Sequence, residues 1–138
     1  MRLLLDTHSL LWYAFGDPRL SGRARTFIDD TGNDKFLSIV SPWEVGIKVG
    51  SGKLSVAKPV DIFFADQMHL LSLQLLPVTL AHVARVSELP FHHRDPFDRM
   101  LVAQSLVEGI ALIPADAVVD AYGVLRLWQP LILYSRIA

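Results

Sequence analysis

The sequence predicts an α/β protein in which helices cover both faces of a parallel sheet. Three observations predict this class. Short apolar runs alternate with segments of helical periodicity, as in strands joined by helical crossovers. The runs are short and apolar, which favours strands buried on both faces of a sheet. The length of 138 residues fits one domain with a substantial core.

The first part of the chain contains two of the predicted strands. Arg2–Leu5 and Phe36–Val40 are short apolar runs. One helical pattern between them ends at the turn Gly16–Pro18, and a second covers Gly22–Asp30. Ser21 precedes that second helix and is expected to cap it.

A helix-start pattern follows the second strand. Ser41 is the predicted N-cap, Pro42 the first helical residue and Glu44 the acid of a capping box. The glycines of the turn Gly50–Gly52 are expected to end this helix.

The same alternation continues to the end of the chain. Asp95 is expected to cap a helix that begins at Pro96, carries Asp98 in its first turn and stops at Gly109. The other elements predicted in this part are the helices Pro59–Leu71 and Leu80–Glu88, the strands Leu73–Val78 and Ile110–Ile113, and, as a fifth strand, Val124–Trp128.

Composition excludes several classes of protein. The absence of cysteine excludes disulfides, thiolate metal sites and thiol nucleophiles. A net charge of −1 excludes a strongly basic nucleic-acid coat. The mean hydropathy of +0.36 is high for a soluble monomer, so part of the surface is expected to meet a partner. No segment resembles a signal peptide or a membrane span, and we therefore expect a cytoplasmic protein that does not bind membranes.

Three acids lie just after predicted strands. Asp6, Glu44 and Asp116 come after the first, second and fourth strands, at the edge where parallel sheets bind ligands. Asp98 opens the helix that leads into the fourth strand, and this coarse topology does not place it at that edge. Each acid also has a purely structural interpretation. Glu44 can pair with Lys48 one turn on, Asp98 can complement the helix dipole, and Asp116 can form a turn before a helix. Asp6 is harder to explain in this way, because a charge directly after a buried strand needs a partner.

Clustered carboxylates repel one another unless a cation lies between them. Oxygen-only ligands suit Mg²⁺ or Mn²⁺, which can polarise a phosphoryl oxygen and lower the pKa of bound water. The placement of the acids therefore suggests metal-dependent hydrolysis of a phosphodiester, next to the structural interpretation of each acid.

Three motifs together resemble one family. They are Leu4–Trp12 (LLDTHSLLW), Ser41–Lys48 (SPWEVGIK) followed by Gly52–Leu54 (GKL), and Leu89–Gln104 (LPFHHRDPFDRMLVAQ). The chain resembles the PIN-domain ribonuclease toxins of bacterial toxin–antitoxin pairs (VapC type, PilT N-terminus-like). The resemblance extends from Arg2 to about Trp128 and implies a single domain over residues 1–130 with a tail at 131–138.

The resemblance implies a three-layer α/β/α fold and an acidic pocket that binds Mg²⁺ or Mn²⁺ and cleaves RNA. By position, the four acids of that pocket are Asp6, Glu44, Asp98 and Asp116. It also implies a cognate antitoxin protein as partner. A homodimer is expected from the apolar composition together with the family. Relatives often carry Ser or Thr two residues before the fourth acid. Pro114 stands there instead, so contact of Asp116 with the metal, direct or through water, is left open.

Other residues of these motifs have weaker predicted roles. The hydroxyls of Thr7 and Ser41 lie beside the first two acids and are expected to orient them. Asp95 is a cap or a further ligand, and Arg99 contacts RNA or forms a salt bridge. The segment 92–94 contacts RNA phosphates or is a solvated loop.

Two other functions are compatible with the same pattern. One is a catalytically silent PIN-like module that binds a DNA-binding antitoxin as a corepressor. The other is a receiver-like phosphoacceptor domain, but the chain lacks the paired acids and the lysine that such a domain requires.

Overall fold

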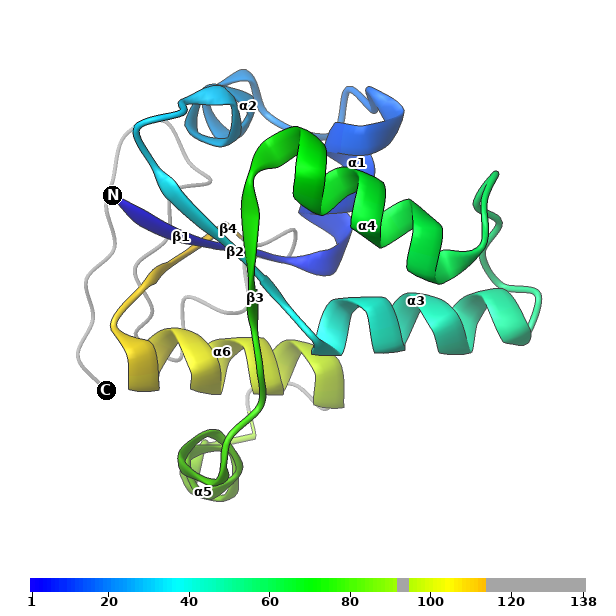
Figure 1. Cartoon of the computed structure of the whole chain (residues 1–138). Helices are drawn as coiled ribbons and strands as arrows, with labels where there is room; N and C mark the ends of the chain where they lie inside the picture. Colours follow the sequence, from blue (N-terminus) through cyan, green and yellow to red (C-terminus); the bar gives the residue numbers. More distant parts are fainter. Residues whose placement is uncertain (92–94, 114–138) are drawn as a thin grey trace.

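The computed structural model describes residues 1–91 and 95–113 and confirms an α/β fold with a central parallel sheet (Figure 1). Four strands pair in the order β3-β2-β1-β4. They are β1 Arg2–Leu5, β2 Asp34–Ser38, β3 Leu73–Leu76 and β4 Ala111–Ile113. The fifth strand predicted over Val124–Trp128 lies outside the described residues.

Six helices occur within the described ranges. They are α1 Thr7–Phe15, α2 Gly22–Asp29, α3 Val40–Gly50, α4 Val60–Leu71, α5 Leu80–Glu88 and α6 Pro96–Glu108. The sheet lies between α1, α2 and α4 on one side and α5 and α6 on the other (Figure 1). None of these helices is long and apolar enough to cross a membrane.

Alternation along β1 divides the core into two layers. Leu3 and Leu5 belong to the cluster shared with α1, α2 and α4. Leu4 points to the opposite face and packs with Leu101 and Val102 of α6. All three leucines are fully buried. Successive strand residues point to opposite faces, so a strand covered on both sides has apolar residues at every position.

The register brings three strand ends to one edge. Leu5 of β1 pairs with Leu37 of β2 and with Ile113 of β4. The chain adds β2 and β3 on one side of β1 and then returns to place β4 on the other. The carboxyl end of β1 therefore lies at the point where the strand order reverses, which is where such sheets bind ligands.

Several predicted helix boundaries are confirmed with their physical cause. The Ser21 side chain accepts a hydrogen bond from Ala24 N. The Asp95 carboxylate accepts bonds from the first turn of α6. Gly16 and Gly109 end α1 and α6 at φ of 65° and 64°, a left-handed conformation that favours glycine.

The predicted start of α3 is wrong. The helix begins at Val40, so Ser41 lies inside it and is not the N-cap, and Glu44 is not the acid of a capping box. Ser38 provides the physical reason, because its hydroxyl accepts a hydrogen bond from Val40 N at 3.1 Å. This interaction also ends β2 at Ser38 rather than at Val40.

Candidate functional site

Asp6 lies between the ends of β1 and β4. Its main-chain N–H donates to the carbonyl of Ile113 at 3.0 Å. Its Oδ2 accepts from His8 N at 3.0 Å, so the carboxylate caps α1. Only 5% of Asp6 is exposed. The strand end and the cap together fix a nearly buried carboxylate at the predicted edge of the sheet.

Glu44 is the most deeply buried of the described acids, at 1% exposure. Its Oε2 accepts from Lys48 Nζ at 2.5 Å. Its Oε1 is buried and has no hydrogen-bond partner among residues 1–91 and 95–113. A buried carboxylate oxygen without a donor is costly, and such atoms often mark a site where an ion or water binds.

A buried hydrogen bond joins the two helices that carry these acids. The hydroxyls of Thr7, at the start of α1, and Ser41, in α3, lie 2.8 Å apart. Thr7 directly follows Asp6, and Ser41 lies one turn before Glu44. This contact fixes the relative positions of the two acids, which is consistent with the orienting role expected for the hydroxyls.

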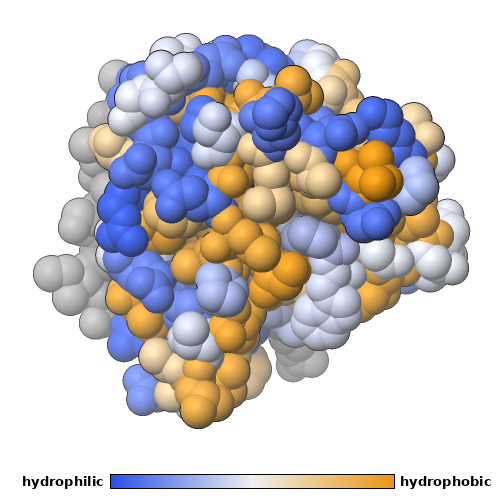
Figure 2. Space-filling view, in the orientation of Figure 1, coloured by the Kyte–Doolittle hydropathy of each residue, from blue (hydrophilic) through white to orange (hydrophobic). Residues whose placement is uncertain are grey.

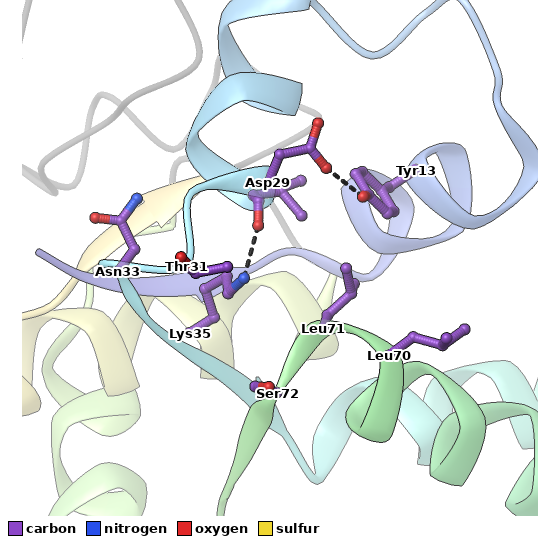
Figure 3. Close-up of a pocket in the computed structure, with 9 residues that line it drawn as sticks. Tyr13, Asp29, Thr31, Asn33, Lys35, Leu70, Leu71 and Ser72 are labelled. Carbon is purple, nitrogen blue, oxygen red and sulfur yellow. Dashed lines mark hydrogen bonds between the residues drawn. The ribbon is translucent and has the colours of Figure 1, made fainter.

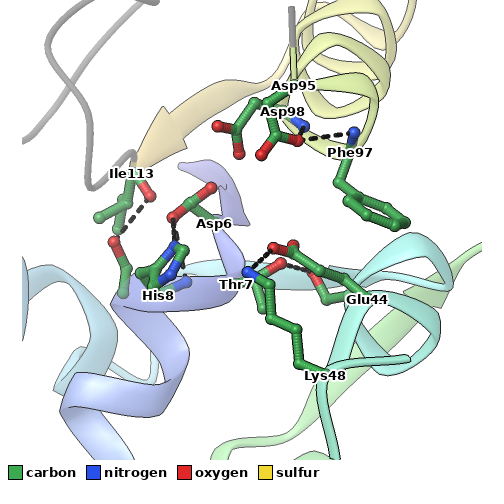
Figure 4. Close-up of polar contacts among 11 residues, drawn as sticks. Asp6, Thr7, His8, Glu44, Lys48, Asp95, Phe97, Asp98 and Ile113 are labelled. Atoms are coloured by element: carbon green, nitrogen blue, oxygen red, sulfur yellow. Dashed lines mark hydrogen bonds and ion pairs between the residues drawn. The ribbon is translucent and has the colours of Figure 1, made fainter. Parts of the chain in front are cut away.

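Asp98 faces the same space from the other side. It lies in the first turn of α6, where Asp95 Oδ1 accepts from Phe97 N at 2.9 Å and from Asp98 N at 3.1 Å. Figure 4 shows Asp98 and Asp95 directed toward Asp6 and Glu44. The 13-residue α6 runs antiparallel to β4, so its first turn returns to the edge where β4 ends. The fold therefore supplies the position that the strand pattern left open.

Lys48 lies inside this group of carboxylates. Burial lowers the pKa of Lys48, but the hydrogen bond to Glu44 and the charges of Glu44, Asp95 and Asp98 outweigh burial. The net pKa is raised above its usual value. The ammonium therefore stays charged and partly neutralises the acids in the metal-free protein. The sequence indicated this contact by the spacing of Glu44 and Lys48, but not the proximity to α6.

The side chains present fit a hard divalent cation by their chemistry. The donors are carboxylates, and one oxygen of Glu44 is buried without a partner. In the described part of the chain, no three Asp, Glu, His or Cys side chains already stand close enough to hold a metal ion. Asp116, predicted as the fourth acid, and segment 92–94, predicted to contact RNA, both lie outside that part.

Arg99 has a different environment from the acid next to it. Only 6% of Arg99 is exposed. Its guanidinium donates to the carbonyls of Pro90, Val86 and Leu89 at 2.9, 3.2 and 3.2 Å. These carbonyls belong to the end of α5 and the residues that follow it. The arrangement favours a structural role for Arg99 over contact with RNA.

An apolar groove of about 460 Å³ lies beside the acids. Trp43 of α3 is 62% exposed there and contacts Phe97 edge-on, with ring centroids 5.1 Å apart. The lining residues are Ile39, Val40, Trp43, Val78, Val86, Pro96 and Met100. Apolar side chains also gather on the face over β3 and α5 (Figure 2), where Leu75, Leu80 and Val83 are exposed.

A second cavity, of about 190 Å³, lies near the amino end of β2 (Figure 3). Tyr13, Asp29, Lys35 and Ser72 are among its lining residues, and none of the predicted site residues is. Lys35 is 4% exposed, and its Nζ donates to the carbonyl of Ile28 at 2.7 Å. The ammonium thus stabilises the C-terminal end of α2, which explains a buried lysine at this position.

The chain is similar to known proteins in sequence and in fold. A family model described as PIN domain matches residues 3–125. None of the curated proteins compared with the sequence matches it significantly.

Three solved structures have a similar fold. VapBC2 from Rickettsia felis, bound to a DNA fragment from their promoter, has a TM-score of 0.66 at 12% identity, covering 88% of this chain and 93% of that one. FitAB bound to an IR36 DNA fragment has a TM-score of 0.62 at 17% identity, with coverages of 93% and 96%. FitAcB from Neisseria gonorrhoeae has a TM-score of 0.63 at 16% identity, with coverages of 91% and 96%.

Proposed function

The chain belongs to the PIN domain family, and from this premise we propose that it is a Mg²⁺- or Mn²⁺-dependent endoribonuclease, the toxin of a toxin–antitoxin pair. The buried, unpaired oxygen of Glu44, which faces Asp6 and Asp98, is the observation that carries the proposal. PIN domains are generally nucleases, and this arrangement has the oxygen donors that a metal-dependent nuclease requires.

Asp6, Glu44 and Asp98, together with Asp116, would hold the cation. When bound, the cation supplies activation of a water molecule and charge stabilisation at the phosphodiester. The chain's own residues set the position of these ligands. The Thr7–Ser41 hydrogen bond fixes α1 against α3, and the Asp95 cap fixes the first turn of α6. Burial of Asp6 and Glu44 keeps their carboxylates in a poorly hydrated site, where charge interactions are stronger than in water.

The proposed partners are RNA as substrate and an antitoxin protein as inhibitor. The apolar groove lined by Trp43 and Met100 lies beside the acids and could accommodate an apolar segment of the antitoxin. Two of the solved neighbours, VapBC2 and FitAB, are complexes bound to DNA. We further propose that the protein forms a homodimer and acts in the cytoplasm.

Single-turnover cleavage of a structured RNA such as tRNA tests the activity. We expect cleavage with Mg²⁺ or Mn²⁺, none with EDTA, and a loss of at least about 100-fold in Asp6→Asn and Asp98→Asn, since each variant removes a ligand charge. Asp61→Asn removes an exposed acid in the first turn of α4 and is the matched control.

Cleavage that survives EDTA would remove the metal mechanism. No cleavage under any condition, together with stable binding of an antitoxin, would instead support the catalytically silent corepressor. Expression without the antitoxin separates these two functions in cells. Growth arrest that Asp98→Ala abolishes supports the nuclease.

A further inference from the structure

Lys48 and Glu44 form an asymmetric ion pair within the acid group. The Glu44 side chain is 1% exposed, whereas that of Lys48 is 33% exposed. One carboxylate oxygen is held by the ammonium at 2.5 Å, and the other has no partner in the described part of the chain. The acid is therefore fixed in the protein interior, while its counter-charge is attached to a long side chain that reaches solvent.

We propose that Lys48 is a tethered counter-cation that competes with the divalent metal for Glu44. The inference rests on the proposed function, because it takes Glu44 as a metal ligand. In the metal-free protein, the ammonium satisfies half of the buried carboxylate. Loading of the metal requires the ammonium to leave Glu44, and rotation of the lysine side chain is sufficient because the two residues lie one helical turn apart.

Two physical effects make this competition strong. A buried carboxylate is unfavourable without a counter-charge, so once the ammonium is removed the metal gains the full interaction with Glu44. In addition, the repulsion between the ammonium and a divalent cation a few ångströms away lowers the affinity of the site for the metal by about tenfold, even at the dielectric constant of water. Lys48 therefore stabilises the empty site and weakens metal binding at the same time.

The position of Lys48 relative to α6 extends the argument. The ammonium is bound to Glu44 of α3, and Asp95 and Asp98 are directed toward this pair from the first turn of α6 (Figure 4). Lys48 therefore faces carboxylates of both α3 and α6 (Figure 4). A lysine that only stabilised α3 by pairing one turn apart would not lie within the field of the first turn of α6.

Metal binding measured in Lys48→Met tests the proposal. We expect this variant to bind Mn²⁺ at least about tenfold more tightly than the wild-type protein by titration calorimetry. In EDTA it is expected to melt at a lower temperature, because Glu44 has lost its counter-charge, and the increase in Tm on adding Mn²⁺ is expected to be larger. Lys48→Gln provides a second neutral variant if the methionine variant does not fold.

Two controls isolate the charge at this position. Lys53→Met removes an exposed lysine shortly after α3 and is expected to leave the Mn²⁺ affinity unchanged. Lys48→Arg keeps the positive charge and is expected to bind Mn²⁺ with an affinity near that of the wild-type protein. A purely structural role predicts a lower Tm with and without Mn²⁺ and no gain in affinity.

The outcomes separate this inference from the proposed function. Wild-type protein that does not bind Mn²⁺ would refute the metal site itself. Wild-type protein that binds Mn²⁺, with Lys48→Met binding equally or more weakly, would refute the competition and leave the metal site intact.

Discussion

The guanidinium of Arg99 holds the end of α5 and the residues that lead toward α6. The last carbonyls of a helix have few partners within the helix. The carbonyl of Val86, in the last turn of α5, accepts from Leu89 N at the C-cap, and the carbonyl of Leu89 follows the helix. Arg99 donates to both of them and to the carbonyl of Pro90. It also lies over the ring of Phe91, with Cζ 4.3 Å from the ring centroid. Replacement of Arg99 by alanine therefore removes several buried contacts at once.

The expected loss of stability follows from these contacts. A hydrogen bond to a charged donor contributes about 1.5–3 kcal/mol when it is buried. Water replaces part of the loss at a residue near the protein surface, so we expect Arg99→Ala to lower the free energy of unfolding by about 3–5 kcal/mol. Arg99→Lys keeps the charge but not the planar group of donors, and we expect a loss of about 2 kcal/mol.

Urea unfolding, followed by tryptophan fluorescence without RNA or metal, measures these losses. Arg23→Ala is the matched control, because Arg23 is exposed and lies over the Phe27 ring at 5.5 Å. It is expected to change the free energy of unfolding by less than about 1 kcal/mol. If Arg99→Ala were no less stable than this control, the structural role would be wrong and contact with RNA would become the better explanation.

Three other predictions concern the surroundings of the acids and the second cavity. Thr7→Val and Ser41→Ala are each expected to destabilise the protein by about 1–2 kcal/mol in urea unfolding. The double variant should lose clearly less than the sum, since the two hydroxyls share one hydrogen bond. Asp95→Ala removes the cap of α6 and is expected to cost about 1 kcal/mol, whereas Asp95→Asn should retain most of it; equal losses by thermal melting would contradict the capping role. The hydrogen bond to Asp29, followed by burial and the charge of Asp29, raises the pKa of Tyr13 above its usual 10.0. Stability from this contact is therefore present below pH 10 and lost as the pH rises through the raised pKa, and Asp29→Asn should lower that pKa in an NMR titration.

Helix ends show how far local signals predict this fold. Ser21 and Asp95 cap their helices as expected, because each side chain accepts hydrogen bonds from main-chain N–H groups only a few residues away. Gly109 ends α6 as expected, because glycine adopts the left-handed conformation without strain. The predicted start of α3 is wrong because Ile39 stands at the N-cap and the serine that accepts from the first helical N–H is Ser38, not Ser41. Ser38 accepts the bond from Val40 N, whereas Ser41 bonds to Thr7, a partner 34 residues away. A preference for serine at helix starts does not distinguish such neighbours.

The start of α5 has a cap that the usual pattern does not include. Thr79 and His82 form a reciprocal capping box in which histidine takes the place of the usual Glu or Gln. His82 is fully buried, and its Nε2 lies 2.9 Å from Oε1 of Glu108 at the end of α6. The histidine is thus satisfied by two helices. Only the pairing of α5 with α6, which is a tertiary contact, makes this arrangement available.

The position of Asp98 follows from the direction in which α6 crosses the sheet, which the coarse order of strands and helices did not supply. In a right-handed crossover, each helix runs antiparallel to the strands it joins, so the first turn of a helix lies at the carboxyl edge of the sheet. Asp98 opens the helix before β4 and therefore reaches the same edge as Asp6, which follows β1. The geometry of the helix itself explains why the side chain of Arg99, one residue later, lies elsewhere. A helix turns about 100° per residue, so the neighbour of a residue that faces the acids faces α5 instead. Stability of the α5 end and the position of the third acid are therefore set by adjacent residues of one helical turn.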